Sequence, residues 1–187
     1  LVLQKGWNLI SLPLIPPGGQ IAAATLFGSV PQFVYWYNIT ETDPLKQWLF
    51  YWPNPGSTLQ WIKDGEAYWV QMANYGIIIV YGTEMPPPDG IPPLPPTYHV
   101  YGPSPSETGK WNYIGFKSLT NMPASVYLAN LKTIVGDWKA HQLFGFNALT
   151  QTWETVFIRP GTTIDDLMTS GQGYLIFMLE AGDIVPP

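Results

Sequence analysis

Short apolar and aromatic runs, separated by clusters of Gly, Pro, Asn and Asp, follow one another along the 187-residue chain. Short runs rich in β-branched and aromatic residues are typical of strands, and the residues between them are typical of turns. The first part of the chain also holds a predicted helix at 21–27, where Ala22-Ala23-Ala24 favour helix and Gly28 ends it. Its predicted strands are 7–12, 33–37, 47–52, 67–72 and 77–81, the last two forming a hairpin.

The second part of the chain follows the same order of elements. A helix is predicted at 124–131, because Pro123 stands at a position that favours helix initiation. Residues 164–168 are interpreted as a helical turn, with Asp165 and Asp166 at the end where acidic residues favour the helix dipole. The pattern therefore predicts a mainly β protein with one short helix in each part. The predicted strands are 113–116, 143–146, 152–157, 174–178 and 183–185.

The two parts also share sequence motifs. Gly-Trp-Asn-Leu-Ile-Ser at 6–11 has a counterpart in Gly-Lys-Trp-Asn-Tyr-Ile-Gly at 109–115, and 65–72 has one at 171–178. It is mainly the apolar framework that matches, which indicates shared packing rather than shared chemistry. We therefore expect two copies of one fold. Four matching aromatic residues are expected in the cores: Trp7, Tyr68, Trp111 and Tyr174.

A proline-rich segment separates the two parts. Seven of the eleven residues 86–96 are proline, a composition that neither continues a helix nor completes a β-ladder and that favours an extended conformation. The predicted organisation is a first β module at 1–85, a linker at 86–97 and a second β module at 98–187. The predicted fold is therefore a tandem duplication of a small β-sandwich or partly open barrel, each copy with one short helix.

Charge and composition exclude several classes of partner. The net charge is −5 and the eight Lys and Arg residues are scattered, so the chain lacks the basic patch that nucleic-acid binding needs. The absence of Cys excludes disulfides and thiolate chemistry, and no run reaches the length of a transmembrane segment. Only 11% of residues are charged and 15% are aromatic, so we expect an adhesive or a densely packed surface. Because the chain starts at Leu1, we expect a segment of a longer protein.

No combination of residues points to catalysis. His99 and His141 lack partners at metal-ligand spacing, so they are interpreted as structural or exposed. Asp64 and Glu66 are a candidate acidic pair for glycoside hydrolysis, but the matching positions of the second part are not acidic. A role in a turn or at a strand entry is therefore preferred for this pair. We expect a non-enzymatic protein with no catalytic residue, metal or cofactor.

The aromatic residues of the first part are the candidate binding residues. Exposed rings can stack on the faces of sugar rings, and strand alternation places Tyr35 and Tyr37 on one face and Trp36 on the other. The alternative is that these rings fill a small core or cover the contact between the modules. Asn38 is a candidate glycosylation site, because it opens the triplet Asn-Ile-Thr. The candidate sugar platform comprises Tyr35, Trp36, Tyr37, Trp48 and Trp52.

The motifs of the first part resemble a β module that recurs in bacterial and archaeal secreted and surface-layer-associated proteins. The resemblance rests on Gly-Trp-Asn-Leu-Ile-Ser at 6–11, an aromatic strand ending in Asn at 34–38, and Gly-x-x-Tyr-Trp-Val at 65–70. It is weaker in the second part, where Lys110 separates Gly109 from Trp111 and Leu175 stands where the first part has Trp. The resemblance implies a non-catalytic β module and supplies no catalytic residue.

These observations favour a non-catalytic structural or interaction tandem of an extracellular surface or assembly protein. Its expected partners are other protein modules of the same surface assembly, and its expected location is extracellular or at the cell surface. The alternative is a carbohydrate-binding tandem that uses the exposed aromatic residues of the first module and binds a polysaccharide. A row of exposed rings would favour the alternative, and an apolar surface without such a row would favour the first.

Overall fold

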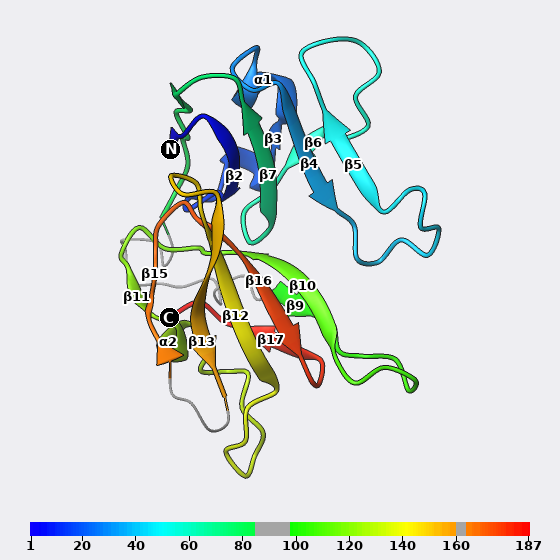
Figure 1. Cartoon of the computed structure of the whole chain (residues 1–187), viewed down its shortest axis with the longest axis vertical. Helices are drawn as coiled ribbons and strands as arrows, with labels where there is room; N and C mark the ends of the chain where they lie inside the picture. The colour runs from blue at the N-terminus through cyan, green and yellow to red at the C-terminus, as the bar shows by residue number, and fades with distance from the viewer. Residues whose placement is uncertain (85–97, 160–163) are drawn as a thin grey trace.

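A computed structural model describes residues 1–84, 98–159 and 164–187, so the predicted linker at 86–97 lies outside the described residues. The prediction of a mainly β protein is confirmed, because antiparallel sheets account for most of the regular structure. Figure 1 shows the strands gathered in two units, with the first half of the chain above the second. The two halves are called the first half, 1–84, and the second half, 98–187.

The first half is built on a four-stranded antiparallel sheet in the order β2-β7-β4-β5. Two short ribbons, β1-β8 and β3-β6, lie beside it with the helix α1 and a 3₁₀ turn, η1. The elements are β1 (Val2–Leu3), β2 (Gly6–Ser11), η1 (Pro17–Gly19), β3 (Ile21–Ala22), α1 (Ala23–Phe27), β4 (Phe33–Tyr37), β5 (Trp48–Tyr51), β6 (Trp61–Ile62), β7 (Ala67–Met72) and β8 (Gly76–Ile77).

The second half is built on a five-stranded antiparallel sheet in the order β10-β16-β12-β13-β14. The ribbons β11-β15 and β17-β9 accompany it, together with the helix α2. The elements are β9 (Tyr98–Val100), β10 (Lys110–Gly115), β11 (Met122–Pro123), α2 (Ala124–Tyr127), β12 (Ala140–Asn147), β13 (Thr152–Ile158), β14 (Ile164–Asp165), β15 (Leu167–Met168), β16 (Gly173–Met178) and β17 (Gly182–Ile184).

The main sheets of the two halves have the same order over four strands, as the shared motifs predict. β10, β16, β12 and β13 follow one another as β2, β7, β4 and β5 do, and β14 is added at the edge. The register agrees as well: Asn8 lies opposite Val70, and Asn112 lies opposite Ile176. Residues at the same place in the two sheets are called equivalent below.

Three details of the sequence-based prediction are wrong. Residues 77–81 do not form a hairpin with β7; instead β8 pairs with β1, because the amide of Ile78 donates to the carbonyl of Leu1 at 2.9 Å. Residues 164–168 form β14 and β15 rather than a helical turn, since Asp165 lies opposite Phe157 at the edge of the main sheet. Both helices are also shorter than predicted: β3 takes the first two residues of the predicted helix 21–27, and α2 ends at Tyr127 rather than at Leu131.

Each half has its own hydrophobic core between its main sheet and its helix and ribbons. Tyr68 and Tyr174 are fully buried at equivalent places, as predicted. The hydroxyl of Tyr68 accepts from the amide of Lys63 at 2.8 Å, and that of Tyr174 accepts from the amide of Thr169 at 2.6 Å. Both tyrosine rings can therefore be buried without leaving a polar group unpaired, because each hydroxyl is hydrogen-bonded.

A pair of equivalent backbone contacts joins the two halves along a seam. The amide of Ser11 donates to the carbonyl of Gly171 at 3.0 Å, and the amide of Gly115 donates to the carbonyl of Gly65 at 2.9 Å. Gly115 allows this approach, because a Cβ there would lie 2.7 Å from the carbonyl oxygen of Glu66. The seam thus fixes β2 and β7 against β10 and β16.

A buried ion pair also crosses the seam. The ammonium Nζ of Lys117 lies 2.7 Å from Oδ2 of Asp64, and the side chains are only 7% and 11% exposed. A buried charge pair holds two segments in a defined geometry, because separating the charges leaves each of them without its partner in a poorly solvated place. The two halves are therefore packed against each other directly.

Candidate binding site

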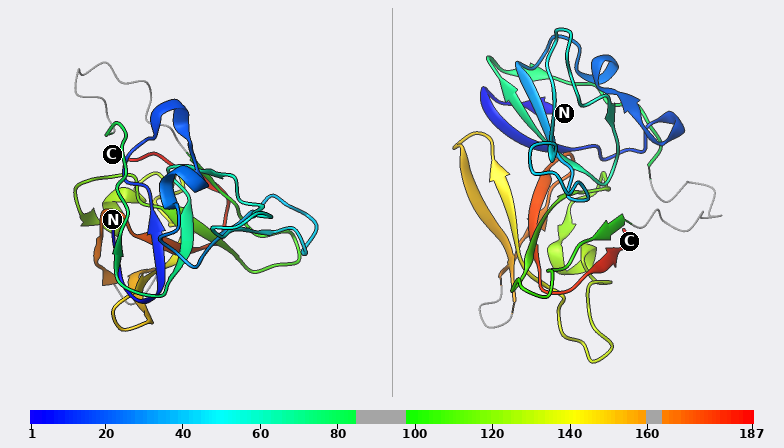
Figure 2. Two further views of the ribbon diagram at one scale, coloured as in Figure 1. Left: turned by 90° about the horizontal axis from the view of Figure 1, so that it is seen from above. Right: turned by 90° about the vertical axis from the view of Figure 1, so that its right-hand side faces the viewer.

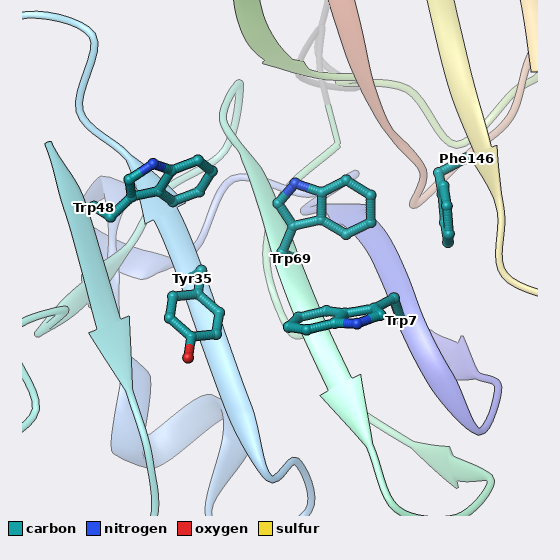
Figure 3. Close-up of a pocket in the computed structure, with 5 residues that line it drawn as sticks. All are labelled: Trp7, Tyr35, Trp48, Trp69 and Phe146. Carbon is teal, nitrogen blue, oxygen red and sulfur yellow. The ribbon is translucent and has the colours of Figure 1, made fainter. Parts of the chain in front are cut away.

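An aromatic groove opens where the outer face of the first sheet meets the β12–β13 hairpin. Strand alternation sends Val34 and Val70 into the core and their neighbours to the outer face. Part of that face is covered by the second half near Leu9 and Ala67, which are buried, and the rest is open. The open part forms a cavity of about 450 Å³ that is lined by Trp7, Tyr35, Trp48, Trp69 and Phe146 (Figure 3).

The rings of the groove are held by contacts with one another. Trp69 occupies the middle, with its centroid 6.0 Å from Trp7 and 4.9 Å from Phe146, both in edge-on geometry. Trp153 supports it from β13 at 5.5 Å. Edge-to-face contacts of this kind stabilise ring pairs beyond the area they bury. Figure 3 shows Trp48, Trp69 and Phe146 in one row that passes from the first half to the second.

The tip of the β12–β13 hairpin clamps the backbone of Trp7. Oε1 of Gln151 accepts from the amide of Trp7 at 2.8 Å, and its Nε2 donates to the carbonyl of Trp7 at 2.9 Å. Gln151 has φ of +59°, a left-handed conformation that is uncommon for a residue other than glycine. The right-hand view of Figure 2 shows the hairpin rising beside the first half. The clamp therefore fixes the wall that carries Phe146.

The chemistry of the groove is that of flat, apolar surfaces. None of its five lining residues carries a charge, and their polar atoms are the indole N–H groups and the hydroxyl of Tyr35. Trp48 is 43% exposed at the rim, whereas the other four rings are half-buried. Such a surface suits a ligand that offers an apolar face to the rings.

The structure brings together only part of the predicted platform. Tyr35 and Trp48 line the groove, and Tyr37 packs against Trp48 with centroids 5.0 Å apart. Trp36 lies on the opposite face, as the alternation predicts, and packs against the core. Trp52 stacks on another ring at the far end of the sheet, so these two residues do not belong to the groove.

Three of the lining residues are missing from the predicted platform: Trp7, Trp69 and Phe146. The prediction that Trp7 and Trp111 lie in the cores is wrong, because Trp7 lines the groove and Trp111 is 42% exposed. The alternation of the strands could have corrected this prediction. Because Tyr68 is buried, its neighbour Trp69 points outward, and the strand register places Trp7 on the same outer face.

The candidate catalytic groups have structural partners. Glu66 accepts from the hydroxyl of Tyr68 at 2.8 Å, and burial raises the pKa of its carboxyl group. Nδ1 of His99 lies 2.8 Å from Oδ1 of Asp183 at the surface, and Nδ1 of His141 contacts a backbone carbonyl. Within the described parts of the chain, no three His, Asp or Glu residues are grouped as metal ligands.

Asn38 follows β4, and its side chain is engaged within its own triplet. Its Oδ1 accepts from the hydroxyl of Thr40 at 2.7 Å and from the amide of Thr40 at 3.2 Å. The triplet is half-buried to exposed and is not packed in a core. Glycosylation of Asn38 therefore stays a prediction from the sequence.

No family model, curated protein or solved structure matches the chain. Among the described residues, there is no helix with the length and hydrophobicity that a membrane crossing requires.

Proposed function

We propose that this chain is a non-catalytic binding tandem of an extracellular or cell-surface protein, and that its aromatic groove binds a polysaccharide. The observation that carries the proposal is the groove itself, in which rings from both halves line one open cavity. The resemblance of the sequence motifs to surface-associated β modules supports the location. A row of rings, rather than scattered exposed residues, is what distinguishes this proposal from a purely structural role.

Stacking explains how such a groove binds sugars. A pyranose ring presents C–H groups on its faces and hydroxyls at its edge, so a face can lie on an aromatic ring while the hydroxyls stay in water. The contact removes apolar surface from water and places the C–H groups against the electron-rich face of the ring. Trp48, Trp69 and Phe146 place apolar ring surfaces one after another along the groove, with Trp69 and Phe146 at 74° to each other, so sugar units bound there would contact rings in different orientations.

The surroundings of the acidic residues support a non-catalytic role. Asp64 is paired with Lys117 at 2.7 Å, and Glu66 is bonded to Tyr68 at 2.8 Å. General acid–base catalysis needs carboxyl groups within reach of a bound substrate. Neither of these residues lines the aromatic groove; both line a separate cavity beside Tyr98.

Affinity electrophoresis in gels that contain single polysaccharides tests the proposal. Retardation of the wild-type chain in at least one gel is expected, and it should fall by about tenfold in apparent affinity in Trp69→Ala and in Trp48→Ala. Trp61→Ala is the matched control, because Trp61 is an exposed indole on β6 outside the groove. Equal retardation of all three variants, with circular dichroism unchanged, would contradict the proposal.

An exposed apolar stripe favours protein modules as a second class of partner. Tyr75, Ile77, Ile79 and Tyr81 alternate along the end of the first half and are 57% to 72% exposed. The position equivalent to Ile77 in the second half is Asp183, so the fold does not require an apolar residue there. Large exposed apolar patches mark interaction surfaces.

Sedimentation velocity tests this second role, with another copy of the chain as the simplest module. The wild-type chain is expected to associate at high concentration, and the double variant Ile77→Lys, Ile79→Lys is expected to stay monomeric. A chain that is monomeric at every concentration would contradict a self-association role for the stripe.

A further inference from the structure

A second cavity, of about 540 Å³, adjoins the aromatic groove on the far side of Trp48. Trp48 lines both cavities, so the two spaces meet at its ring. The second cavity continues along the contact between the halves, where Tyr37 and Trp48 come from the first half and Trp111 and Tyr113 from the second. A single ligand of sufficient length can therefore occupy both.

Rings continue from one cavity into the other. The centroid of Tyr113 lies 5.9 Å from that of Trp48 and 6.1 Å from that of Tyr37. Beyond them Trp111 is 42% exposed and is held by Phe177, with centroids 4.8 Å apart. The stacking surface thus extends well beyond the five rings of the first cavity.

The two cavities differ in their polar groups. The first has only uncharged rings, whereas Gln47, Glu107 and Lys110 line the second. These three side chains offer an amide, a carboxylate and an ammonium group, which together provide donors and acceptors for hydroxyls. One negative and one positive group leave the combined groove without net charge.

We infer that the two cavities together bind one extended, uncharged polysaccharide chain that passes over Trp48. The inference rests on the proposed function and adds the length and charge of the ligand. Sugar units stack on the rings of the first cavity, and hydroxyls of later units bond to the polar side chains of the second. An acidic polysaccharide is disfavoured, because its repeated negative charges would meet Glu107 and a chain with net charge −5 without a compensating basic cluster.

Calorimetric titration with oligosaccharides of increasing length tests this inference. Cello-, xylo-, malto- and laminari-oligosaccharides serve as neutral probes, and polygalacturonate serves as the acidic one. For the neutral series that binds, affinity is expected to rise from the disaccharide to the hexasaccharide by about tenfold or more. In Trp111→Ala the disaccharide should bind as in the wild type, and the rise with length should be lost.

The controls separate this inference from the proposed function. Trp61→Ala should keep the full length dependence, because Trp61 lies outside both cavities. Binding that depends on Trp69 but stops rising at the trisaccharide, and that Trp111→Ala leaves unchanged, would overturn the inference and keep the proposed function. Tighter binding of polygalacturonate than of every neutral probe would overturn the assignment of charge. Failure of every probe and polymer to bind would overturn both.

Discussion

Tyr68 and Tyr174 are equivalent and are buried in the same way, whereas their neighbours Trp69 and Leu175 are equivalent and differ. Both tyrosine hydroxyls accept from a backbone amide and donate to the residue two positions earlier, which is Glu66 in one half and Gln172 in the other. The inner faces of the two main sheets thus make the same contacts in both halves. On the outer faces the residues are apolar in both halves but differ in kind, so the outer face of one half can bind a ligand that the other does not.

The seam shows the same contrast in its charges. The backbone bonds of Ser11 and Gly115 occur at equivalent places, but the ion pair of Asp64 with Lys117 has no equivalent among the described residues. Ser170 stands at the position equivalent to Asp64. The backbone contacts are therefore part of what the two halves share, and the ion pair is an addition that makes one side of the seam different from the other.

The largest expected effect is that of breaking this ion pair. Lys117→Met should lower the free energy of unfolding by about 3 to 5 kcal/mol, because it leaves the carboxylate of Asp64 buried without its cation. Urea unfolding at pH 7 measures the loss. The double variant Asp64→Leu, Lys117→Met should recover to within about 1 kcal/mol of the wild type. A double variant as unstable as the single one would show that Lys117 acts through packing rather than charge.

The next effect tests whether the two buried tyrosines are equivalent in energy. Tyr68→Phe and Tyr174→Phe should each cost about 1 to 3 kcal/mol, because each leaves a backbone amide and a side-chain oxygen without a hydrogen bond. Thermal and urea unfolding measure the two losses side by side. A loss in one variant and none in the other would contradict the equivalence of the two cores.

The strands and the buried tyrosines could be predicted because their signals are local. Tyr68 lies in an alternating run whose apolar positions face one side, and its counterpart Tyr174 lies in a matching run. The groove could be predicted only in part, since it depends on contacts far apart in sequence. Gln151 clamps Trp7 from 144 positions away, and no local pattern indicates that contact. The segment 164–168 was mispredicted because pairing with Phe157 overrides its local helix signal.

Replacing Trp7 is expected to affect stability less than the tyrosine variants do, and to affect binding more than stability. Because its ring is half-buried in an open groove, Trp7→Ala should cost about 1 to 2 kcal/mol, less than the about 3 to 5 kcal/mol of a fully buried Trp. Trp111→Ala, at the equivalent exposed place, should cost a similar amount. Urea unfolding of both variants measures the costs, and affinity electrophoresis measures binding. A loss of about 3 to 5 kcal/mol in the free energy of unfolding of Trp7→Ala would show that Trp7 acts mainly in folding.

The smallest effect concerns Glu66, whose equivalent in the second half is the amide Gln172. Burial raises the pKa of Glu66 above 4.5, and nearby Asp64 adds to the rise, whereas the hydrogen bond from Tyr68 and the charges of Lys63 and Lys117 oppose it. The folded state therefore binds this proton more tightly than the unfolded state does. The resulting contribution to stability is complete below the unfolded pKa and is lost as the pH rises through the folded pKa.

Glu66→Gln should remove this contribution without removing the contact, because Gln172 makes the same bond to Tyr174 at 3.2 Å. The variant should be less dependent on pH than the wild type above about pH 4.5, and at pH 7 it should differ by less than about 1 kcal/mol. Urea midpoints measured from pH 4 to pH 8 give the difference directly. Gln172→Glu is the matched reverse and should create a new loss of stability as the pH rises. If the urea midpoint of Glu66→Gln depends on pH as strongly as that of the wild type, a group other than Glu66 titrates in this range. Glu66 and Gln172 would then be equivalent in position but not in their effect on stability.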